Sequence, residues 1–318
     1  MKLLLGIVIL LAFTIESPIL VMPAENTPTG AYVPSVILTA PWSKKNLMAD
    51  KVLSEPGEFG FWLNSEDLEC GPTAFTVAPN GDIYIADIIN DRIQHFSSNG
   101  SLLSIIPDVR VGADAGMRVD REGNIYTGDF YTVNPYVIKF GPKGTWLATY
   151  PIVKDAEMGT DSPGNWGGQG SILVDDSGGV FVQYMMGNIE YSLQVGTKYA
   201  PFSSAQQKAS WKQGFYGLTA NLPNGNKRYS GNIMGMDSEY EYEIEKDEKN
   251  ENISIVSKYQ NGKLIATYNL DWKQIECPLL TAFNMGPRQV FDKGNLYVFC
   301  SDKDGIKIIK WSPVTAGK

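Results

Sequence analysis

Residues 71–106 read GPTAFTVAPNGDIYIADIINDRIQHFSSNGSLLSII, and their pattern gives the clearest indication of the fold. It contains four short runs rich in β-branched and aromatic residues, which lie at 73–77, 83–86, 92–96 and 102–106. Asn80-Gly81 separates the first two runs and Asn99-Gly100 the last two, and Asn-Gly is the strongest short signal for a hairpin turn. The stretch therefore predicts a four-stranded antiparallel meander with two tight turns and one longer loop.

The same register returns along the chain. A second copy covers residues 117–150, with Glu122-Gly123 at the first turn. A third copy starts at Ser171. A fourth starts near Leu218, and after an insertion it resumes at Ile253. A fifth runs from Val290 to Trp311 and lacks a fourth strand.

One four-stranded sheet cannot bury both of its faces, whereas copies packed in a ring can, and the ring leaves only short protected edges. We therefore predict an all-β fold, with residues 25–318 forming a single β-propeller of four-stranded antiparallel blades. The β-rich run Val33–Thr39 (VPSVILT) precedes the first copy. We expect it to supply the outer strand that the fifth copy lacks, which would close the ring.

The first copy resembles an NHL repeat. The matching residues are Gly71-Pro72, Val77, Asn80-Gly81, Ile83-Tyr84-Ile85-Ala86-Asp87, Asn90, Arg92-Ile93 and Phe96. The second copy keeps most of the pattern, and the others keep only the turns and the hydrophobic spacing. The resemblance implies a propeller, usually of six blades, in which residues like Asp87 and Arg92 cap a turn and tie neighbouring blades. Residues 40–70 contain another β-rich run, Phe59–Leu63, so six blades are expected, with five as the alternative.

The N-terminus has the pattern of an export signal. Met1-Lys2 precedes an unbroken apolar run of 13 residues, Leu3–Ile15, which Glu16 ends. A membrane-spanning helix needs about 20 apolar residues, so the run fits the core of a secretory signal better. We expect residues 1–24 to be a signal peptide cut after Ala24 or near Ser17, with an uncleaved anchor as the alternative. The mature chain would then be secreted or extracytoplasmic, in the periplasm or at the cell surface, without a membrane span.

Charge and residue counts limit the chemistry. The formal net charge of −8 disfavours nucleic acid as a partner. A single histidine, His95, excludes zinc sites that need two or three histidines of one chain, and we interpret it as a residue on the solvated face of a strand. Three cysteines allow at most one disulfide. Cys277 and Cys300 flank the last copy and could pair in an oxidising compartment, and three buried thiols are the alternative.

The longest connections point to one face of the predicted propeller. If the strands of each blade are lettered a to d from the axis outward, the a–b turns are all short. The long segments belong to b–c or d–a connections and cover residues 130–136, 154–169, 203–214 and 233–251. Because long loops on a rigid scaffold often carry binding, we expect this loop-rich face to bind the ligand. The candidate residues are Asp87, Arg92, Asp129, Tyr131 and Trp166. The alternative is that these loops have drifted without a function.

The segment Glu239–Glu245 (EYEYEIE) alternates strictly, which would place four glutamates on one side of a strand. Such a row could hold a cation such as calcium, but no calcium-binding loop pattern accompanies it. A solvated hairpin edge that deters aggregation explains it better. No cofactor is therefore predicted.

These observations favour a monomeric, non-catalytic binding or scaffold protein for a protein, carbohydrate or other small-molecule ligand. The alternative is a metal-dependent hydrolase resembling gluconolactonases, which hold a divalent metal in the central channel with Glu, Asn and Asp side chains. Matching ligands cannot be placed in this sequence. Lyases resembling streptogramin lyase depend on histidines, and the single His95 counts against them. A third reading is a passive spacer in a cell-surface assembly.

Overall fold

The computed structural model describes residues 29–43, 54–63, 69–72, 74–107, 109, 116–129, 135–152, 171–175, 177–186, 189–213, 235–236, 240–247, 249–260, 263–274 and 289–315. Nearly all the regular structure in these ranges is β-strand, and the few helices are short 3₁₀ turns. Within the same ranges, no helix is long and apolar enough to cross a membrane.

Blade 1 is the meander that residues 71–106 predict. Its strands are β4 (Ala74–Val77), β5 (Ile83–Asp87), β6 (Arg92–Phe96) and β7 (Leu102–Pro107), paired antiparallel in that order. Gly81 and Gly100 occupy the tight turns with φ of +90° and +84°, a conformation that side chains other than glycine rarely adopt. The short 3₁₀ helix η1 (Ile88–Asn90) fills the longer loop between β5 and β6.

Blades 2 and 3 follow the same plan. Blade 2 contains β8 (Arg118–Val119), β9 (Ile125–Asp129), β10 (Tyr136–Phe140) and β11 (Trp146–Pro151). Blade 3 contains β12 (Ser171–Val174), β13 (Gly179–Met186), β14 (Ile189–Thr197), β15 (Ala200–Pro201) and β16 (Lys208–Gln213), with the 3₁₀ helix η3 (Ser204–Gln206) between the last two. Both β15 and β16 pair with β14, so together they form an interrupted outer strand.

Blades 4 and 5 form one continuous eight-stranded sheet. Blade 4 contains β17 (Gly235–Met236), β18 (Glu241–Asp247), β19 (Asn250–Gln260) and β20 (Lys263–Asp271), and the 3₁₀ helix η4 (Trp272–Gln274) follows it. Blade 5 contains β21 (Gln289–Asp292), β22 (Asn295–Asp302), β23 (Gly305–Thr315) and β1 (Thr29–Pro41).

Two of the four segments that were expected to be loops contain strands. Residues 203–214 were predicted as an inter-blade loop, but Lys208–Gln213 pairs with β14 along its whole length. Residues 233–251 were predicted as a b–c loop, but 241–247 is the second strand of blade 4 and pairs with β19. The alternation of EYEYEIE has the structural consequence expected of a strand, since Tyr242 and Ile244 are buried. The strand is not a free hairpin edge, because β17 pairs with its other side at 241–242.

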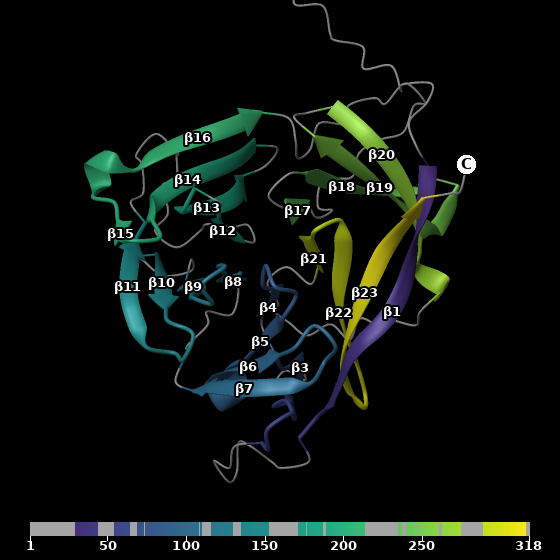
Figure 1. The fold of residues 1–318 in the computed structure, drawn as a ribbon, viewed down its shortest axis with the longest axis horizontal. Coiled ribbons are helices and arrows are strands. Elements are labelled where there is room, and N and C mark those ends of the chain that lie inside the picture. Colours follow the sequence, from purple (N-terminus) through teal and green to yellow (C-terminus); the bar gives the residue numbers. More distant parts are fainter. Residues whose placement is uncertain are drawn as a thin grey trace, which may run out of the picture.

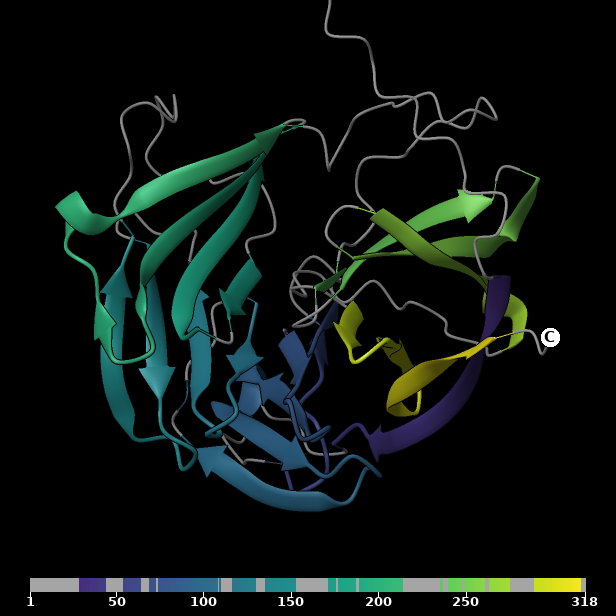
Figure 2. The same cartoon turned by 45° about the horizontal axis from the view of Figure 1, so that its top comes forward.

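The N-terminal strand β1 lies along the C-terminal strand β23. Their antiparallel register runs from Gly30 opposite Thr315 to Pro41 opposite Gly305. At its first residues β1 also pairs in parallel with β20, with Thr29 opposite Thr267. Figures 1 and 2 show β1 as the purple strand between the green strands of blade 4 and the yellow strands of blade 5. The first and last described parts of the chain are thus held together by backbone hydrogen bonds.

The blades follow one another around a centre (Figure 1). Their innermost strands are neighbours in the order β17, β21, β4, β8 and β12. The fold is therefore a β-propeller of four-stranded antiparallel blades. The described residues contain four separate sheets of at least four strands, the largest holding blades 4 and 5. Among the described residues of 40–70, the strand pairs apart from the end of β1 are β2 (Trp62–Leu63) with β3 (Glu69–Cys70) and the isolated bridge between Trp42 and Phe59, so the expected count of six blades is not confirmed.

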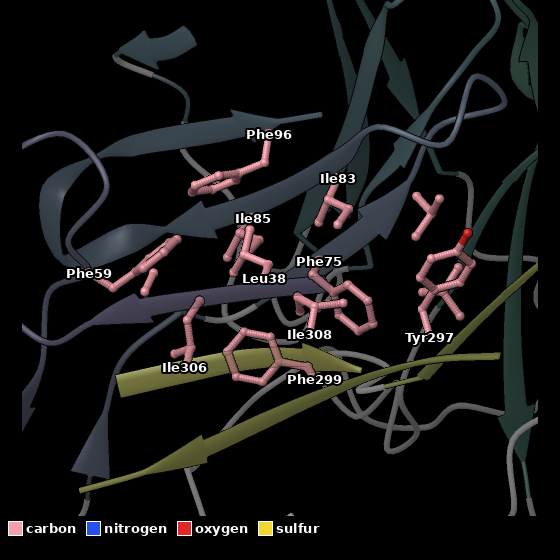
Figure 3. Packing of buried hydrophobic residues seen from close by; sticks show 13 residues of the cluster. Leu38, Phe59, Phe75, Ile83, Ile85, Phe96, Tyr297, Phe299, Ile306 and Ile308 are labelled. Carbon is pink, nitrogen blue, oxygen red and sulfur yellow. The ribbon is translucent and has the colours of Figure 1, made fainter. Parts of the chain in front are cut away.

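Apolar side chains fill the spaces between blades. Figure 3 shows the cluster between blades 1 and 5, where Phe75 of β4 lies 5.9 Å from Phe299 of β22, between ring centroids. Leu38 of β1 and Phe59 belong to the same cluster. Similar clusters lie between blades 1 and 2 and between blades 2 and 3. Burying one such side chain fully contributes about 1.5–3 kcal/mol, so these clusters fix the positions of the inner strands.

Cys300 of β22 is buried and disulfide-bonded. The predicted partner, Cys277, lies outside the described residues. The side chain of Cys300 packs in the cluster shared with blade 4, among residues that include Ile244, Val256 and Leu270. Phe299, next to it in the strand, faces blade 1 instead.

A candidate ligand pocket at the centre of the ring

A pocket of about 760 Å³ opens at the centre of the propeller. Its walls are residues of the inner strands β4, β8, β12 and β21 and of the a–b turns that follow them. Ligand pockets of small molecules typically measure roughly 300–1,000 Å³. The pocket is thus large enough for a small molecule, and four blades contribute to it.

Three of the a–b turns have the same backbone conformation. In each, the backbone N–H of the first residue donates to the carbonyl oxygen four residues later, from Ala78 to Asp82, from Asp120 to Asn124 and from Asp175 to Gly179. A glycine with positive φ occupies the fourth position of each turn, as at Gly123 with φ of +79°. The turns therefore present equivalent positions to the pocket, which are Ala78, Asp120 and Asp175.

The carboxylate of Asp120 holds its own turn together. Its Oδ1 accepts from the backbone N–H groups of Glu122 and Asn124, both at 2.9 Å. Its Oδ2 accepts from Asn124 Nδ2 at 2.8 Å and from the hydroxyl of Tyr126 at 3.1 Å. Burial, and then the negative charge of Asp120, raise the pKa of Tyr126. Asp175 does the same work in blade 3, since its Oδ1 accepts from Ser177 Oγ and from the N–H of Gly179, both at 2.7 Å.

Arg118 of β8 crosses from blade 2 to blade 3 inside the pocket wall. Its Nε donates to the carbonyl oxygen of Ile172 in β12 at 3.1 Å. This is the one hydrogen bond that its guanidinium makes with the part of the chain that the structure describes. Burial lowers the pKa of Arg118, and the nearby charge of Asp292 in blade 5 opposes that shift. The side chain thus lies among three blades, and Arg118 is one of the residues that line the pocket.

Lys293 holds the turn of blade 5 against blade 1. It has positive φ, +49°, and its Nζ donates to the carbonyl oxygen of Pro79 in the turn of blade 1. Phe291, two residues earlier, is buried and stacks on Tyr242 with ring centroids 4.3 Å apart. Arg121 is a further basic residue of the pocket wall.

Tyr84 of β5 adds an aromatic ring to the wall. It stacks on His95 of β6, with centroids 4.1 Å apart. The His95 Nε2 lies 3.0 Å from Asp82 Oδ2, and its Nδ1 lies 3.3 Å from Ser104 Oγ. Burial, and then the charge of Asp82, raise the pKa of Tyr84 to about 12. His95 lies on a strand and is partly exposed, in agreement with the interpretation of the sequence.

Two of the predicted site residues, Asp87 and Arg92, form a buried structural network away from the pocket. The Nε of Arg92 donates to Asp87 Oδ2 at 2.9 Å, and neither side chain is more than 6% exposed. The other nitrogens of Arg92 donate to Ser54, to the carbonyl oxygen of Glu55 and to that of Glu58. Asp87 also accepts from the N–H of Gly60 at 3.1 Å. The pair therefore fastens residues 54–60 onto blade 1.

Burial raises the pKa of Asp87, while Arg92, Asn90 and the N–H of Gly60 oppose this shift. The other candidates are not placed in the pocket. Asp129 ends β9, and its backbone pairs with Tyr136, but its side chain is outside the description. Tyr131 and Trp166 lie outside the described residues, as do segment 154–169 and most of 130–136.

The pocket therefore lies at the a–b turns, on the side opposite to the predicted loop-rich face. Loop length pointed away from it, because all the turns around it are short. A signal for these residues was present in the repeats, since Asp120 and Asp175 directly follow strand a of their copies, and Asp292 is the last residue of strand a in blade 5. Within the described ranges, no group of three His, Cys, Asp or Glu side chains is placed to hold a metal ion.

Neither protein-family models nor curated proteins match the chain. Among solved structures, the chain is similar to a protein of unknown function from Bacteroides caccae, at 12% identity over 79% of this chain and 75% of that one, with a TM-score of 0.35. It is also similar to virginiamycin B lyase from Staphylococcus aureus, at 13% identity over 78% and 71%, with a TM-score of 0.33.

A protein from Lactobacillus plantarum is similar at 13% identity over 88% of this chain and 83% of that one, with a TM-score of 0.34. Likeness at this level carries no information about activity, ligand or site residues. The propeller rests on the strand pairing of the chain itself, and the NHL resemblance stays a prediction.

Proposed function

We propose that this chain is an exported propeller that binds a small molecule in its central pocket and does not convert it. The observation that carries the proposal is the pocket of about 760 Å³ enclosed by the inner strands and a–b turns of four blades. Its position at the turns replaces the loop-rich face as the proposed binding surface.

The walls of the pocket are built to keep their shape. They consist of strands held in sheets and of turns whose donors and acceptors are paired, as at Asp120 and Asp175. A site on such elements holds its geometry before the ligand arrives, which lowers the entropic cost of binding. Apolar residues such as Val119 and Leu173 alternate with polar ones along the wall, as in small-molecule sites.

The chemistry of the wall favours binding over catalysis. The carboxylate of Asp120 already accepts four hydrogen bonds, which is its full capacity. It is thereby a poor general base. His95 is beside Tyr84 and contacts Asp82, and it is not among the residues that line the pocket.

The ring closure belongs to this proposal. β1 pairs with β23 over its length and buries Tyr32, whose hydroxyl donates to the carbonyl oxygen of Gly294 at 2.9 Å. Gly294 lies in the turn that carries Lys293 at the pocket. We propose that β1 closes the ring and thereby holds the pocket wall of blade 5 in place.

Export is supported by the disulfide at Cys300, because disulfides persist mainly in oxidising compartments. Cys70 and Cys277 are the two other cysteines of the chain. Cys300 faces the cluster shared with blade 4, and the chain leaves blade 4 through η4, shortly before Cys277. This orientation supports the pair Cys277–Cys300.

Peptide mapping without reduction tests the pairing and the export together. Protein recovered from outside the cytoplasm should begin after the apolar run Leu3–Ile15 and should contain a peptide linking Cys277 to Cys300. A Cys70–Cys300 link would contradict the pairing. Free thiols in a chain that keeps residues 3–15 and stays in the cytoplasm would contradict the export.

Binding is tested with a panel of neutral, cationic and anionic small molecules, by thermal shift and then calorimetry on residues 25–318. Leu173→Trp places an indole in the pocket, and Leu103→Trp changes a 54% exposed residue of the outer strand β7 as the matched control. At least one compound should bind the natural chain and Leu103→Trp but not Leu173→Trp. Equal binding to both variants would show that the ligand binds outside the pocket. Turnover of the bound compound would contradict the proposal that the protein does not convert its ligand.

A further inference from the structure

We propose that the pocket recognises an oxyanion, the carboxylate or phosphate group of a small organic ligand, and that Arg118 is its anchor. This inference rests on the proposed function and deepens it, since it names the chemical class of the ligand. It follows from the hydrogen bonds that Arg118 makes, from the acids around it and from the position of Lys293.

Arg118 has donors to spare at the pocket. A guanidinium carries five N–H donors, and the N–H at Nε is the one that binds a protein acceptor among the described residues, the carbonyl oxygen of Ile172. The four N–H groups of the terminal nitrogens remain for a ligand. An arginine stays protonated in proteins even when burial lowers its pKa, so this position keeps a full positive charge.

The bond to Ile172 also fixes the direction of the guanidinium. Because Nε donates to a carbonyl oxygen of blade 3, the planar guanidinium is held in one orientation. Its two terminal nitrogens then keep a fixed position relative to each other and to the pocket. Two parallel N–H groups on such an edge match the two oxygens of a carboxylate or phosphate. A preorganised donor pair of this kind binds oxyanions more tightly than a mobile ammonium does.

The aspartates of the pocket do not occupy the terminal N–H donors of Arg118. Asp120 and Asp175 direct oxygens at the donors of their own turns, which satisfies much of their hydrogen-bonding capacity. Asp292 is close enough to oppose the pKa shift of Arg118, but no hydrogen bond or ion pair joins the two side chains in the described structure. Asp292 therefore favours the protonated form of Arg118, lowers the positive potential around it, and leaves its terminal N–H groups for a ligand.

A second cation stands at the turn of blade 5. One N–H of Lys293 is used by the carbonyl oxygen of Pro79, which holds the ammonium beside the turn of blade 1. An ammonium has three N–H donors, so two remain. The pocket wall carries three cations, Arg118, Arg121 and Lys293, and three carboxylates, Asp120, Asp175 and Asp292, so its formal charge is zero, whereas the whole chain carries −8. The attraction for an anion therefore comes from the unused N–H donors of Arg118 and Lys293 and not from an excess of positive charge. Leu173, Val119 and Phe291 offer apolar contact to the rest of an organic anion.

The test is calorimetry of residues 25–318 with two probes, inorganic phosphate and citrate, and with glucose as the neutral probe. We expect phosphate or citrate to bind and glucose not to. The preferred probe then identifies the group, phosphate or carboxylate. Arg118→Gln should weaken binding at least tenfold, and Arg118→Lys should weaken it less, because the charge is kept while the paired donors are lost. Lys263→Gln, which removes an exposed lysine of blade 4, is the matched control and should leave binding unchanged.

Three results separate this inference from the proposed function. If neither anion binds, or if Arg118→Gln binds as tightly as the natural chain, the inference is wrong. If a neutral compound binds and Leu173→Trp blocks it, the pocket remains a binding site although the anion assignment has failed. If Arg118→Gln does not fold, as judged by its thermal transition, Arg118→Lys and Lys293→Gln decide, since unchanged anion affinity in both would overturn the proposal.

Discussion

Gly100, in the c–d turn of blade 1, lies directly against the carbonyl oxygen of Ile37 in β1, so a Cβ added to Gly100 would stand 2.1 Å from that oxygen. The same turn of blade 2 sits on the outer strand of blade 1, where a Cβ added to Gly144 would stand 2.7 Å from Ile106 Cγ2. The c–d turn of each of these blades thus packs against the outer strand of the preceding blade. The turn of blade 2 contacts β7, and the turn of blade 1 contacts β1 in the same way. This is the relationship expected if β1 serves as the outer strand of blade 5.

Gly100→Ala should therefore destabilise the protein more than Gly57→Ala does. The two glycines have φ of +84° and +86°, but a Cβ at Gly57 would meet nothing within 4 Å. Both changes carry the cost of a left-handed alanine, about 1–2 kcal/mol. Gly100→Ala adds a clash with backbone, on the order of 1–3 kcal/mol. Urea unfolding measures the difference, and equal losses would argue against the contact between blade 1 and β1.

Leu38→Ala tests what β1 contributes to the core. Leu38 is 3% exposed and packs in the cluster of Figure 3, whereas Val36 on the same strand is 50% exposed. Removing a buried leucine side chain usually costs about 2–5 kcal/mol, since the cavity closes only in part. Leu38→Ala should lower the free energy of unfolding by that amount and Val36→Ala by less than about 0.5 kcal/mol. Similar small effects of both would mean that β1 is not seated on the propeller in solution.

Arg92→Met should act on stability and not on ligand affinity. It removes the buried partner of Asp87 and the donors to Ser54 and Glu58, and breaking a buried pair from one side costs about 3–5 kcal/mol. The double variant Asp87→Asn/Arg92→Met should lose less than the sum of the single changes, because no unpaired buried charge remains. Thermal and urea unfolding give the stabilities. A stable Arg92→Met that has lost ligand binding would restore Arg92 as a site residue.

Asp302 should make a pH-dependent contribution to the free energy of unfolding. Lys307 and the N–H groups of Asp304 and Gly305 donate to its carboxylate and hold the pKa below its usual value. A depressed pKa in the folded state stabilises the protein above the unfolded pKa, about 3.9, and that stabilisation is lost as the pH falls through the folded value. Because Lys307 is a third exposed, the effect should be about 0.5–1 kcal/mol.

Asp302→Asn should thus be less stable than the natural chain at pH 7, and its deficit should be smaller at pH 2.5, as judged by urea midpoints. Lys263→Gln changes the net charge by the same amount in the opposite direction at an exposed position, and it shows how far net charge alone affects the midpoints. A deficit of Asp302→Asn that stays the same at both pH values would show that the carboxylate charge is not involved.

Local patterns were enough to predict the meanders, because each strand pairs with its neighbour in sequence and Asn-Gly or Glu-Gly marks the turns. Local patterns failed at Lys208–Gln213, which is a polar run with no strand pattern of its own. It is a strand because its backbone pairs with the edge of β14. They also failed at 241–247, where the strand alternation was recognised but the copy was given the wrong register. In both cases tertiary pairing decided the structure.

The pocket was out of reach for a different reason. Arg118, Ile172 and Asp292 belong to three blades and meet only because the inner strands converge on the axis. No spacing in the sequence encodes that distance. The binding face was predicted from the longest loops, and these belong to the face opposite the pocket. The turns around the pocket are short, so loop length could not indicate it. The repeated Asp after strand a was the sequence feature nearest to the site.

Crystals can show whether Arg118 anchors an oxyanion in the central pocket. The most direct measurement is an anomalous difference map from crystals of residues 25–318 soaked in tungstate, a heavy analogue of phosphate. We expect a peak in the pocket, with tungstate oxygens about 2.7–3.2 Å from the terminal nitrogens of Arg118, and no such peak in Arg118→Gln. Tungstate bound only outside the pocket, or bound there equally in Arg118→Gln, would contradict it.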